Sequence, residues 1–342
     1  MLVRFFIVVL FLAVVLLAGA VLLPANVHVE RHIIIERAPA ILHGVLNDLH
    51  HFQSWSPWSE KDPDARYSYS GAERGVGARM NWSGDPRQVG TGWQEITESQ
   101  PYSLVRTRLD LGEQGKAQAY FEIRPSGRGS RVIWGFDTDV TEDRGFFGAL
   151  MGKYMGLMLD HWIGNDYSEG LESLKQYAET LPNADYSRME IEIVDVPAQS
   201  ILYVSSSSGR SDAAVAAALG AAYGEISRFM AARGIDNAGQ PMAISYNSNP
   251  NSYQFDAAIP IDIASVNTRG NIKVGQTPSG RAVRAVHKGP YNEMDASYEK
   301  IAAFIAVQRL EHDGVSWEHY ISDPGSIPES QLITHVYFML EE

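Results

Sequence analysis

The sequence predicts an α+β protein in which an N-terminal apolar helix precedes two folded domains. Its 342 residues are enough for two domains of ordinary size with room for an anchor or linker. Apolar residues make up 45% and charged residues 20%, as is typical of folded chains. Short glycine-bounded segments in the first half, and an order of five elements that occurs twice in the second, indicate antiparallel sheets combined with helices.

The first element is an uncharged stretch over residues 5–23, which ends at Pro24. As a helix, these 19 residues would be about 28 Å long, close to the thickness of a bilayer core. The alternative is a cleaved signal peptide, because Ala18-Gly19-Ala20 has the small-x-small pattern of a cleavage site. The apolar run continues for three residues beyond that pattern. The sequence therefore favours a retained transmembrane anchor over residues 1–25.

The orientation of this anchor follows from the charges that flank it. Arg4 and the amino terminus favour a cytoplasmic tail, whereas Arg31 and Arg37 lie close to the other end. A very short charged tail usually stays inside the cell. We therefore expect a single-pass inner-membrane protein whose soluble domains lie on the periplasmic side.

Residues 26–180 predict a first domain that begins with a strand and ends with a long helix. Residues 27–35 alternate as in a strand, and Pro39 opens a helical pattern. Residues 67–139 contain short segments separated by glycines, which indicates hairpins of an antiparallel sheet. Residues 146–178 read as one long helical region, and residues 181–187 read as a linker.

Residues 188–342 contain an internal repeat. Tyr223-x-x-Ile226-x-x-Phe229 recurs 75 positions later as Tyr298-x-x-Ile301-x-x-Phe304, each time in a helical window. Two strand-like segments precede each window and two follow it, so the sequence predicts two ββαββ units in tandem. The expected strands are 189–196, 201–207, 241–247, 253–261, 271–277, 281–288, 315–322 and 333–340.

Composition excludes several classes of function. The chain has 28 Lys and Arg against 41 Asp and Glu, a net charge of −13, and no basic cluster that would bind nucleic acid. It has no cysteine, which excludes disulfides, thiolate nucleophiles and Cys-ligated metals. Metalloprotease, Walker and dinucleotide-binding motifs do not occur either. We therefore expect no cofactor, no metal site and no nucleic-acid partner, and the sequence does not identify a protein partner.

Tryptophan is concentrated in the first domain, which holds six of the seven. A sheet wrapped around a long helix, with this much aromatic area, could enclose a cavity for an apolar ligand. A large aromatic core is the alternative. The candidates for the cavity wall are Trp82, Trp93 and Trp134.

The same region carries a family resemblance in its short motifs. These are Pro39-Ala40 at a helix start, Asn47-Asp48 with Phe52, Trp55-Ser56-Pro57-Trp58, and Gly75-Val76-Gly77-Ala78 with Trp82. Over residues 27–178 the sequence resembles the START-related (SRPBCC) ligand-binding superfamily, and within it the polyketide cyclase/dehydrase-like group. The resemblance implies a helix-grip fold, in which an antiparallel sheet curls around a C-terminal helix and encloses a hydrophobic cavity.

In the second domain, Glu318 is the candidate for chemistry. It lies in Trp317-Glu318-His319-Tyr320 on an expected strand, so Glu318 and Tyr320 share one face. In an aromatic pocket such a carboxylate either attracts a cation or exchanges protons at a raised pKa. The alternative is an exposed strand glutamate. Tyr246 falls close to the repeat-equivalent position of Tyr320 and is a further candidate for ligand binding.

A second family resemblance bears on this choice. The segments Gly289-Pro290-Tyr291, Tyr298, Trp317-Glu318-x-Tyr320-x-x-Asp323-Pro324 and Ala258-Ile259-Pro260-Ile261 are similar to the gyrase-inhibitor-like (GyrI-like) effector-binding domain of some AraC- and MerR-type regulators. The resemblance covers residues 188–342. It implies that Glu318 meets lipophilic cations, with Tyr320 beside it and Tyr291 and Tyr298 as walls. Some members of that family are hydrolases of strained electrophilic rings that use the same glutamate.

The function expected from the sequence is therefore membrane-anchored binding, for sequestration or sensing, of hydrophobic and cationic or amphipathic small molecules in two pockets. The alternative is a hydrolase of small electrophilic compounds with Glu318 as general acid or base. A transcription regulator is disfavoured, because no segment is left for a helix-turn-helix and the chain is acidic.

Overall fold

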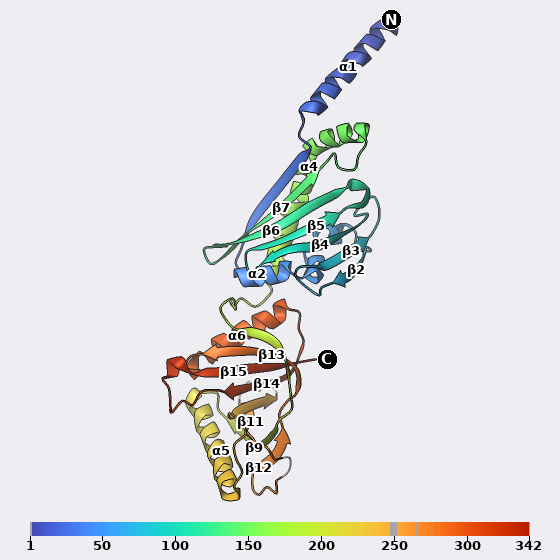
Figure 1. Cartoon of the computed structure of the whole chain (residues 1–342). Helices are drawn as coiled ribbons and strands as arrows, with labels where there is room; N and C mark the ends of the chain where they lie inside the picture. Colours follow the sequence, from blue (N-terminus) through green and yellow to red (C-terminus); the bar gives the residue numbers. More distant parts are fainter. Residues whose placement is uncertain (1, 247–251, 264–265, 342) are drawn as a thin grey trace. The chain divides into compact units, whose positions relative to one another are not determined.

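The computed structural model describes residues 2–246, 252–263 and 266–341, and it divides into two compact units (Figure 1). Unit 1 is Met1–Ser187 and unit 2 is Arg188–Glu342. Both are mixed α and β, with one antiparallel sheet each. The expected α+β class is confirmed.

Unit 1 is a seven-stranded antiparallel sheet with one long helix on it. The strand order is β1-β7-β6-β5-β4-β3-β2, so β2 to β7 form a meander and β1 pairs with its last strand. The strands are β1 (Asn26–Ile35), β2 (Arg66–Gly71), β3 (Ala78–Ser83), β4 (Thr91–Gln100), β5 (Leu104–Asp110), β6 (Lys116–Ser126) and β7 (Gly129–Asp139). The helices are α1 (Leu2–Leu22), α2 (Pro39–Leu46), η1 (Leu49–Ser54), α3 (Pro57–Lys61), η2 (Gly112–Gln114) and α4 (Phe146–Ala178).

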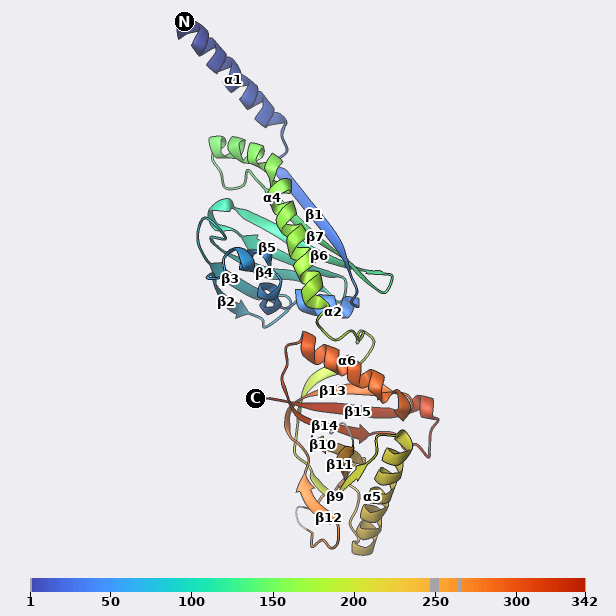
Figure 2. The ribbon, with the colours of Figure 1, turned by 180° about the vertical axis from the view of Figure 1, so that it is seen from behind.

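The C-terminal half of α4 closes the core of unit 1. Tyr167, Leu171 and Leu174 are buried against the sheet, along which the helix runs (Figure 2). Two short helices begin where the sequence allows: Pro39 is the first residue of α2, and the Ser56 side chain accepts a hydrogen bond from the backbone of Trp58 at the start of α3.

The N-terminal stretch forms the helix α1. Its described side chains are largely exposed, among them Phe5, Phe6, Leu10 and Phe11. Among the residues that the structure describes, no helix is both long and apolar enough to pass through a membrane.

Unit 2 is an eight-stranded antiparallel sheet with two α-helices, α5 and α6. The order β8-β9-α5-β10-β11 is followed by β12-β13-α6-β14-β15, which confirms the repeated ββαββ order. The strands are β8 (Ile191–Val196), β9 (Ser200–Ser208), β10 (Met242–Tyr246), β11 (Tyr253–Pro260), β12 (Ile272–Gln276), β13 (Gly280–Lys288), β14 (His312–Tyr320) and β15 (Ile333–Leu340). The helices are α5 (Asp212–Arg233), η3 (Tyr291–Glu293), α6 (Met294–Val307) and η4 (Glu329–Gln331). Of the expected strand 241–247, residue 247 lies outside the described residues.

The two repeats of unit 2 exchange their first strands. The strand order is β12-β9-β11-β10-β14-β15-β13-β8, so β8 pairs with β13 of the second repeat and β12 pairs with β9 of the first. If every strand is replaced by its equivalent in the other repeat, the same order results when the sheet is read from its opposite edge. The sheet therefore has a pseudo-two-fold axis between β10 and β14.

Each helix of unit 2 covers its own half of the sheet. Ile226 of α5 packs with Leu202 and Phe255, and Ile301 of α6 packs with Val283 and Val336. Both isoleucines are fully buried, as their place in the repeat predicts. The central strands β10 and β14 lie between these two helix-covered clusters.

Candidate functional site

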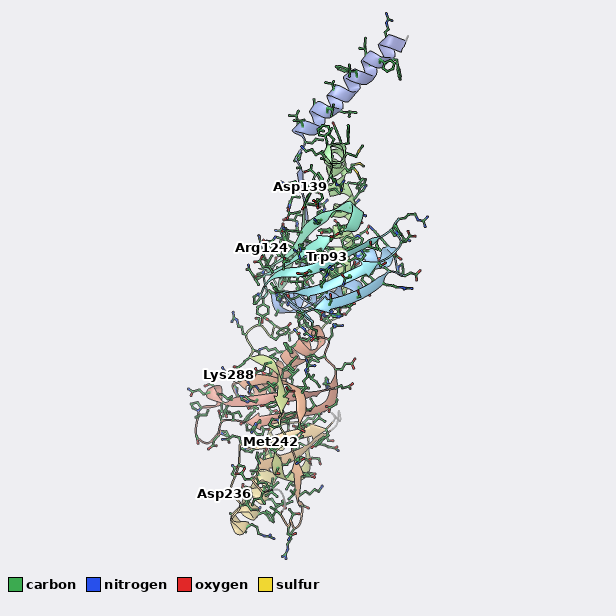
Figure 3. All side chains as sticks on the ribbon, turned by 45° about the vertical axis from the view of Figure 1, so that its right-hand side comes forward. Trp93, Arg124, Asp139, Asp236, Met242 and Lys288 are labelled. Atoms are coloured by element: carbon green, nitrogen blue, oxygen red, sulfur yellow. The ribbon has the colours of Figure 1, made fainter. Side chains whose placement is uncertain are left out.

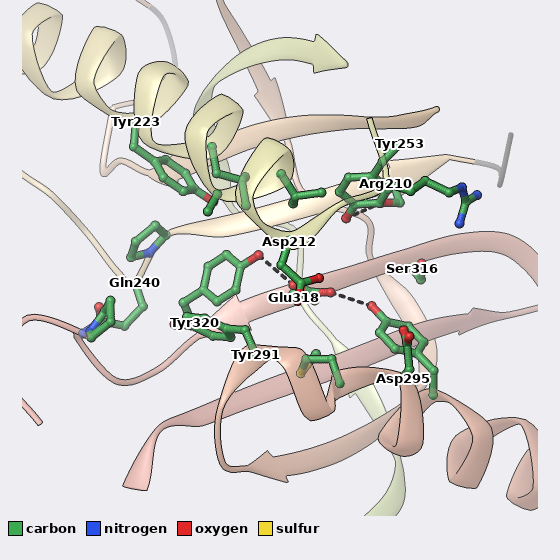
Figure 4. A pocket seen from close by; sticks show the side chains of 18 of the residues that line it. Arg210, Asp212, Tyr223, Gln240, Tyr253, Tyr291, Asp295, Ser316, Glu318 and Tyr320 are labelled. Atoms are coloured by element: carbon green, nitrogen blue, oxygen red, sulfur yellow. Dashed lines mark hydrogen bonds between the residues drawn. The ribbon is translucent and has the colours of Figure 1, made fainter. Parts of the chain in front are cut away.

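A pocket lies in unit 2, between the two helices and over the central strands. Its volume is about 1100 Å³, and its wall contains residues of α5, α6, β10 and β14 (Figure 4). Glu318 of β14 lies in this wall, opposite Ala243 of β10 in the strand register. Since 243 and 318 differ by the repeat offset of 75, the carboxylate lies on the pseudo-two-fold axis and has alanine as its equivalent.

Both oxygens of Glu318 accept a hydrogen bond from a tyrosine. The hydroxyl of Tyr298, from α6, donates to Oε1 at 2.8 Å, and the hydroxyl of Tyr320, on the same strand, donates to Oε2 at 2.6 Å. Burial, followed by the charge of Glu318, raises the pKa of both phenols well above the ordinary value. The two phenols therefore stay protonated and serve as donors, which leaves the glutamate as a pure acceptor.

Further tyrosines complete an aromatic wall around the carboxylate. Tyr291 meets Tyr320 edge to face, with 5.6 Å between ring centroids. Tyr253 accepts a hydrogen bond from the Ser245 hydroxyl at 3.0 Å, and burial raises the pKa of Tyr253 to about 12. Tyr223 of α5 also lines the pocket, and its hydroxyl is buried without a hydrogen-bond partner in the described part of the chain.

The pocket lining is acidic. Four carboxylates belong to it (Asp212, Asp295, Glu318 and Asp323), against one guanidinium, that of Arg210. This excess of negative charge favours a positively charged occupant. The buried aromatic area beside it favours an apolar one.

The structure brings together four of the five residues predicted for this domain, namely Glu318, Tyr320, Tyr291 and Tyr298. Tyr246 is not with them. It lines a separate pocket of about 360 Å³, together with Asp256 and Phe255. The repeat offset of 75 makes Ser245, not Tyr246, the equivalent of Tyr320, and a shift of one residue moves a side chain to the opposite face of a strand. Ser245 does line the larger pocket.

Tyr223 is a pocket residue that we did not predict, although the signal was present. It is the repeat equivalent of Tyr298, so the two tyrosines approach the site from the two helices.

The three tryptophans proposed for a cavity in unit 1 do not line a common space. Trp134 is buried and stacks on Tyr167 with 3.7 Å between centroids. The Trp82 indole donates to the backbone carbonyl of Val89 at 3.2 Å. Trp82 pairs with Gly92, so the next residue, Trp93 (labelled in Figure 3), points to the other face of the sheet. There the Arg79 guanidinium lies 3.9 Å from the centroid of the Trp93 ring. For Trp134 the aromatic-core alternative therefore describes the structure.

Within the described residues, no group of three or more His, Asp or Glu side chains could hold a metal ion.

Comparison with known proteins gives two matches to family models, one for each unit. Residues 26–179 match the model described as polyketide cyclase / dehydrase and lipid transport. Residues 189–341 match the model described as GyrI-like small molecule binding domain. The two matched domain types are thus a lipid-transport or cyclase type and a small-molecule-binding type, in this order along the chain. A search of curated proteins gave no match.

Solved structures resemble parts of the chain at low identity. A hydrolase from Listeria innocua is 15% identical, with 44% of this chain and 92% of that one covered and a TM-score of 0.34. The EcmrR C-terminal domain is 14% identical, with 45% and 99% covered and a TM-score of 0.39. Protein CV1439 from Chromobacterium violaceum is 12% identical, with 45% and 98% covered and a TM-score of 0.32. Likenesses this distant do not indicate a function.

Proposed function

Starting from a chain whose two halves match a lipid-transport or cyclase type and a small-molecule-binding type, we propose that unit 2 binds lipophilic cations, with Glu318 as their charge partner. The observation that carries the proposal is the Glu318 carboxylate, held by two phenols in a pocket of about 1100 Å³. Sequestration or sensing of such compounds would follow from binding alone.

The tyrosines around Glu318 make the site suited to a delocalised cation. A cation in the pocket beside this tyrosine pair could contact an aromatic ring and the carboxylate at the same time. The two phenols already hold the carboxylate in place, so binding needs little rearrangement of the acid. The acidic lining raises the local concentration of cations further.

Glu318→Gln tests the charge pairing, because the amide keeps the size of the side chain and removes its charge. With tetraphenylphosphonium as the probe, isothermal titration on the full chain should show an affinity lowered by about tenfold or more, equivalent to about 1.4 kcal/mol. The neutral triphenylphosphine oxide should bind parent and variant with equal affinity. Glu329→Gln, an exposed acid-to-amide change in η4 of the same unit, is the matched control and should change neither affinity.

Two results would contradict this proposal. Equal losses for the cation and the neutral probe would mean that Glu318 shapes the pocket and does not pair with charge. Consumption of a strained-ring electrophile such as styrene oxide by the parent but not by Glu318→Gln, without cation binding, would favour the hydrolase alternative. In that case Glu318 would act on water, and Tyr298 and Tyr320 could protonate the opening ring.

For unit 1 and α1 we propose a hydrophobic ligand and attachment to the inner membrane, with both units on the periplasmic side. The match of unit 1 to a lipid-transport type supports the ligand class. The uncharged residues 5–23 and the exposure of Phe5, Phe6 and Phe11 support the attachment.

The topology has a direct test. Alkaline phosphatase, which is active only outside the cytoplasm, should be active when fused after Glu342. A green fluorescent protein at the same position should stay dark if it is exported unfolded. The opposite pair of results would place both units in the cytoplasm and overturn the proposed orientation.

A further inference from the structure

The first fourteen residues of α4 differ sharply in charge from the rest of the helix. Residues 146–159 include one charged residue, Lys153, and no acid. From Asp160 onward the helix carries four acids, at positions 160, 166, 169 and 172.

In this segment the large apolar side chains lie on the exposed face, whereas a helix on the surface of a soluble domain has polar side chains there. The face toward the sheet consists of small residues: Gly152 and Gly156 are buried, and a Cβ on Gly152 would lie 2.1 Å from the backbone oxygen of Val140. The outer face is apolar and exposed, with Phe147 at 82%, Met151 at 62% and Leu157 at 63%. An amphipathic helix on a globular domain normally buries such side chains and exposes polar ones.

This apolar face is continuous with a second apolar surface, that of α1. The Tyr154 hydroxyl donates to the backbone carbonyl of Leu16 at 2.7 Å, and Gly19 leaves room for the same tyrosine. The two helices therefore meet within unit 1, and both have large apolar side chains exposed there. The exposed set on α4 is Phe146, Phe147, Met151, Met155, Leu157, Met158 and Trp162.

We propose that residues 146–159 of α4 lie in the surface of a lipid bilayer, with their outer face at the boundary between headgroups and acyl chains. The inference rests on the proposed membrane attachment of α1. A helix of this kind inserts its apolar side chains about 5–10 Å deep and lies parallel to the membrane plane. Lys153 is the basic residue of the segment that would meet lipid phosphates, and the half-exposed Trp162, just beyond the segment, would mark the boundary with water.

The absence of cysteine from the chain allows a direct measurement with nitroxide spin labels. Single cysteines at Met155, Phe11 and Val76 would report on α4, on α1 and on an exposed loop residue of unit 1 that serves as the control. The full-length labelled chains would be reconstituted in vesicles of equal parts phosphatidylcholine and phosphatidylglycerol. Collision rates with oxygen, which concentrates in lipid, and with a water-soluble nickel chelate would then be compared.

The inference predicts a ratio of oxygen to nickel collisions at Met155 at least about tenfold above that at Val76, with Phe11 deeper still. A lipid-like Phe11 with a water-like Met155 would overturn the inference and leave the anchor intact. A water-like result at both positions would overturn the attachment as well. Shielding of the label at position 155 from both reagents would indicate that a protein partner or a second copy of the chain covers α4. That result would also overturn the inference. Cation binding at Glu318 is measured separately and does not depend on any of these outcomes.

Discussion

His43 shows what burial does to a single titratable side chain in this protein. It lies in α2, is 9% exposed, and its Nε2 is 3.1 Å from the Ser99 hydroxyl. Loss of solvation lowers the pKa of His43 from 6.5 to about 4. The folded state therefore holds this imidazole neutral at pH values where the unfolded chain would protonate it.

This shift makes the stability of unit 1 depend on pH. Between pH 6.5 and about 4 the unfolded state binds the extra proton, so stability is complete above this window and falls as the pH drops through it. The loss attributable to His43 is on the order of 3 kcal/mol. Urea unfolding followed by tryptophan emission, which reports mainly on the six tryptophans of unit 1, should show a flatter pH dependence for His43→Gln. His161→Gln, at an exposed position, is the control, and an equal flattening there would refute the assignment.

Two residues of the site show what the sequence could and could not predict at this scale. The period of two along a strand was enough to put Glu318 and Tyr320 on one face, and the hydrogen bond between them confirms that they are neighbours. The same period separates Tyr246 from the Glu318 pocket, since being one position away from the equivalent of Tyr320 reverses the face. An approximate alignment of repeats is sufficient to find a strand, but it does not show which of its residues faces the Glu318 pocket.

Among the elements, α4 depends on glycine at one close approach. A methyl group at Gly152 would meet the backbone oxygen of Val140 at 2.1 Å, and backbone atoms cannot move aside as a side chain can. The hydrophobic periodicity of residues 146–178 predicted the helix. It did not indicate which face of the N-terminal part would be buried, because the buried positions there are glycines, Gly152 and Gly156.

Gly152→Ala should therefore destabilise unit 1 by about 1–3 kcal/mol, the usual cost of overpacking, despite the higher helix propensity of alanine. Gly148→Ala is the matched control, one turn earlier, where the new methyl would meet only the exposed Arg144 side chain, at 3.2 Å. We expect Gly148→Ala to be neutral or slightly stabilising in the same urea titration. Equal effects of the two variants would show that α4 does not depend on this approach.

The strands of unit 2 give a similar lesson about prediction. Element order is local and could be predicted, but pairing is not local. The exchange of β8 and β12 between the repeats joins residues 68 to 94 positions apart, and no pattern within either strand specifies its partner. The pairing instead goes with the packing of the helices: β12 packs with α5, and β8 packs with α6.

For the whole molecule, the relevant observation is that each unit has its own core. Unit 1 is built around the cluster that includes Trp55, Trp134 and Leu174, and unit 2 around separate clusters beneath α5 and α6. The division into two domain types was accessible from the sequence because each half has its own motifs and element order. The place of Trp134 in the core of unit 1 was not, because aromatic composition alone does not distinguish a cavity wall from a core.

Separate cores predict that a ligand stabilises only the unit that binds it. Tetraphenylphosphonium at about 100 times its dissociation constant should stabilise unit 2 by about 2.7 kcal/mol. Hydrogen–deuterium exchange should therefore slow in peptides of β10, β14 and β15, while peptides of β6 and β7 exchange as before. Comparable slowing in both units would show that they are energetically coupled.

The stack of Trp134 on Tyr167 bears on the kinetics of ligand binding by unit 1. The two rings lie face to face inside the core, so if the ligand proposed for unit 1 binds between the sheet and α4, they must separate before it enters. Opening of the protein, and not diffusion of the ligand, would then limit the rate of ligand association. The observed association rate would level off as ligand concentration rises, and the plateau would measure how often this aromatic pair comes apart.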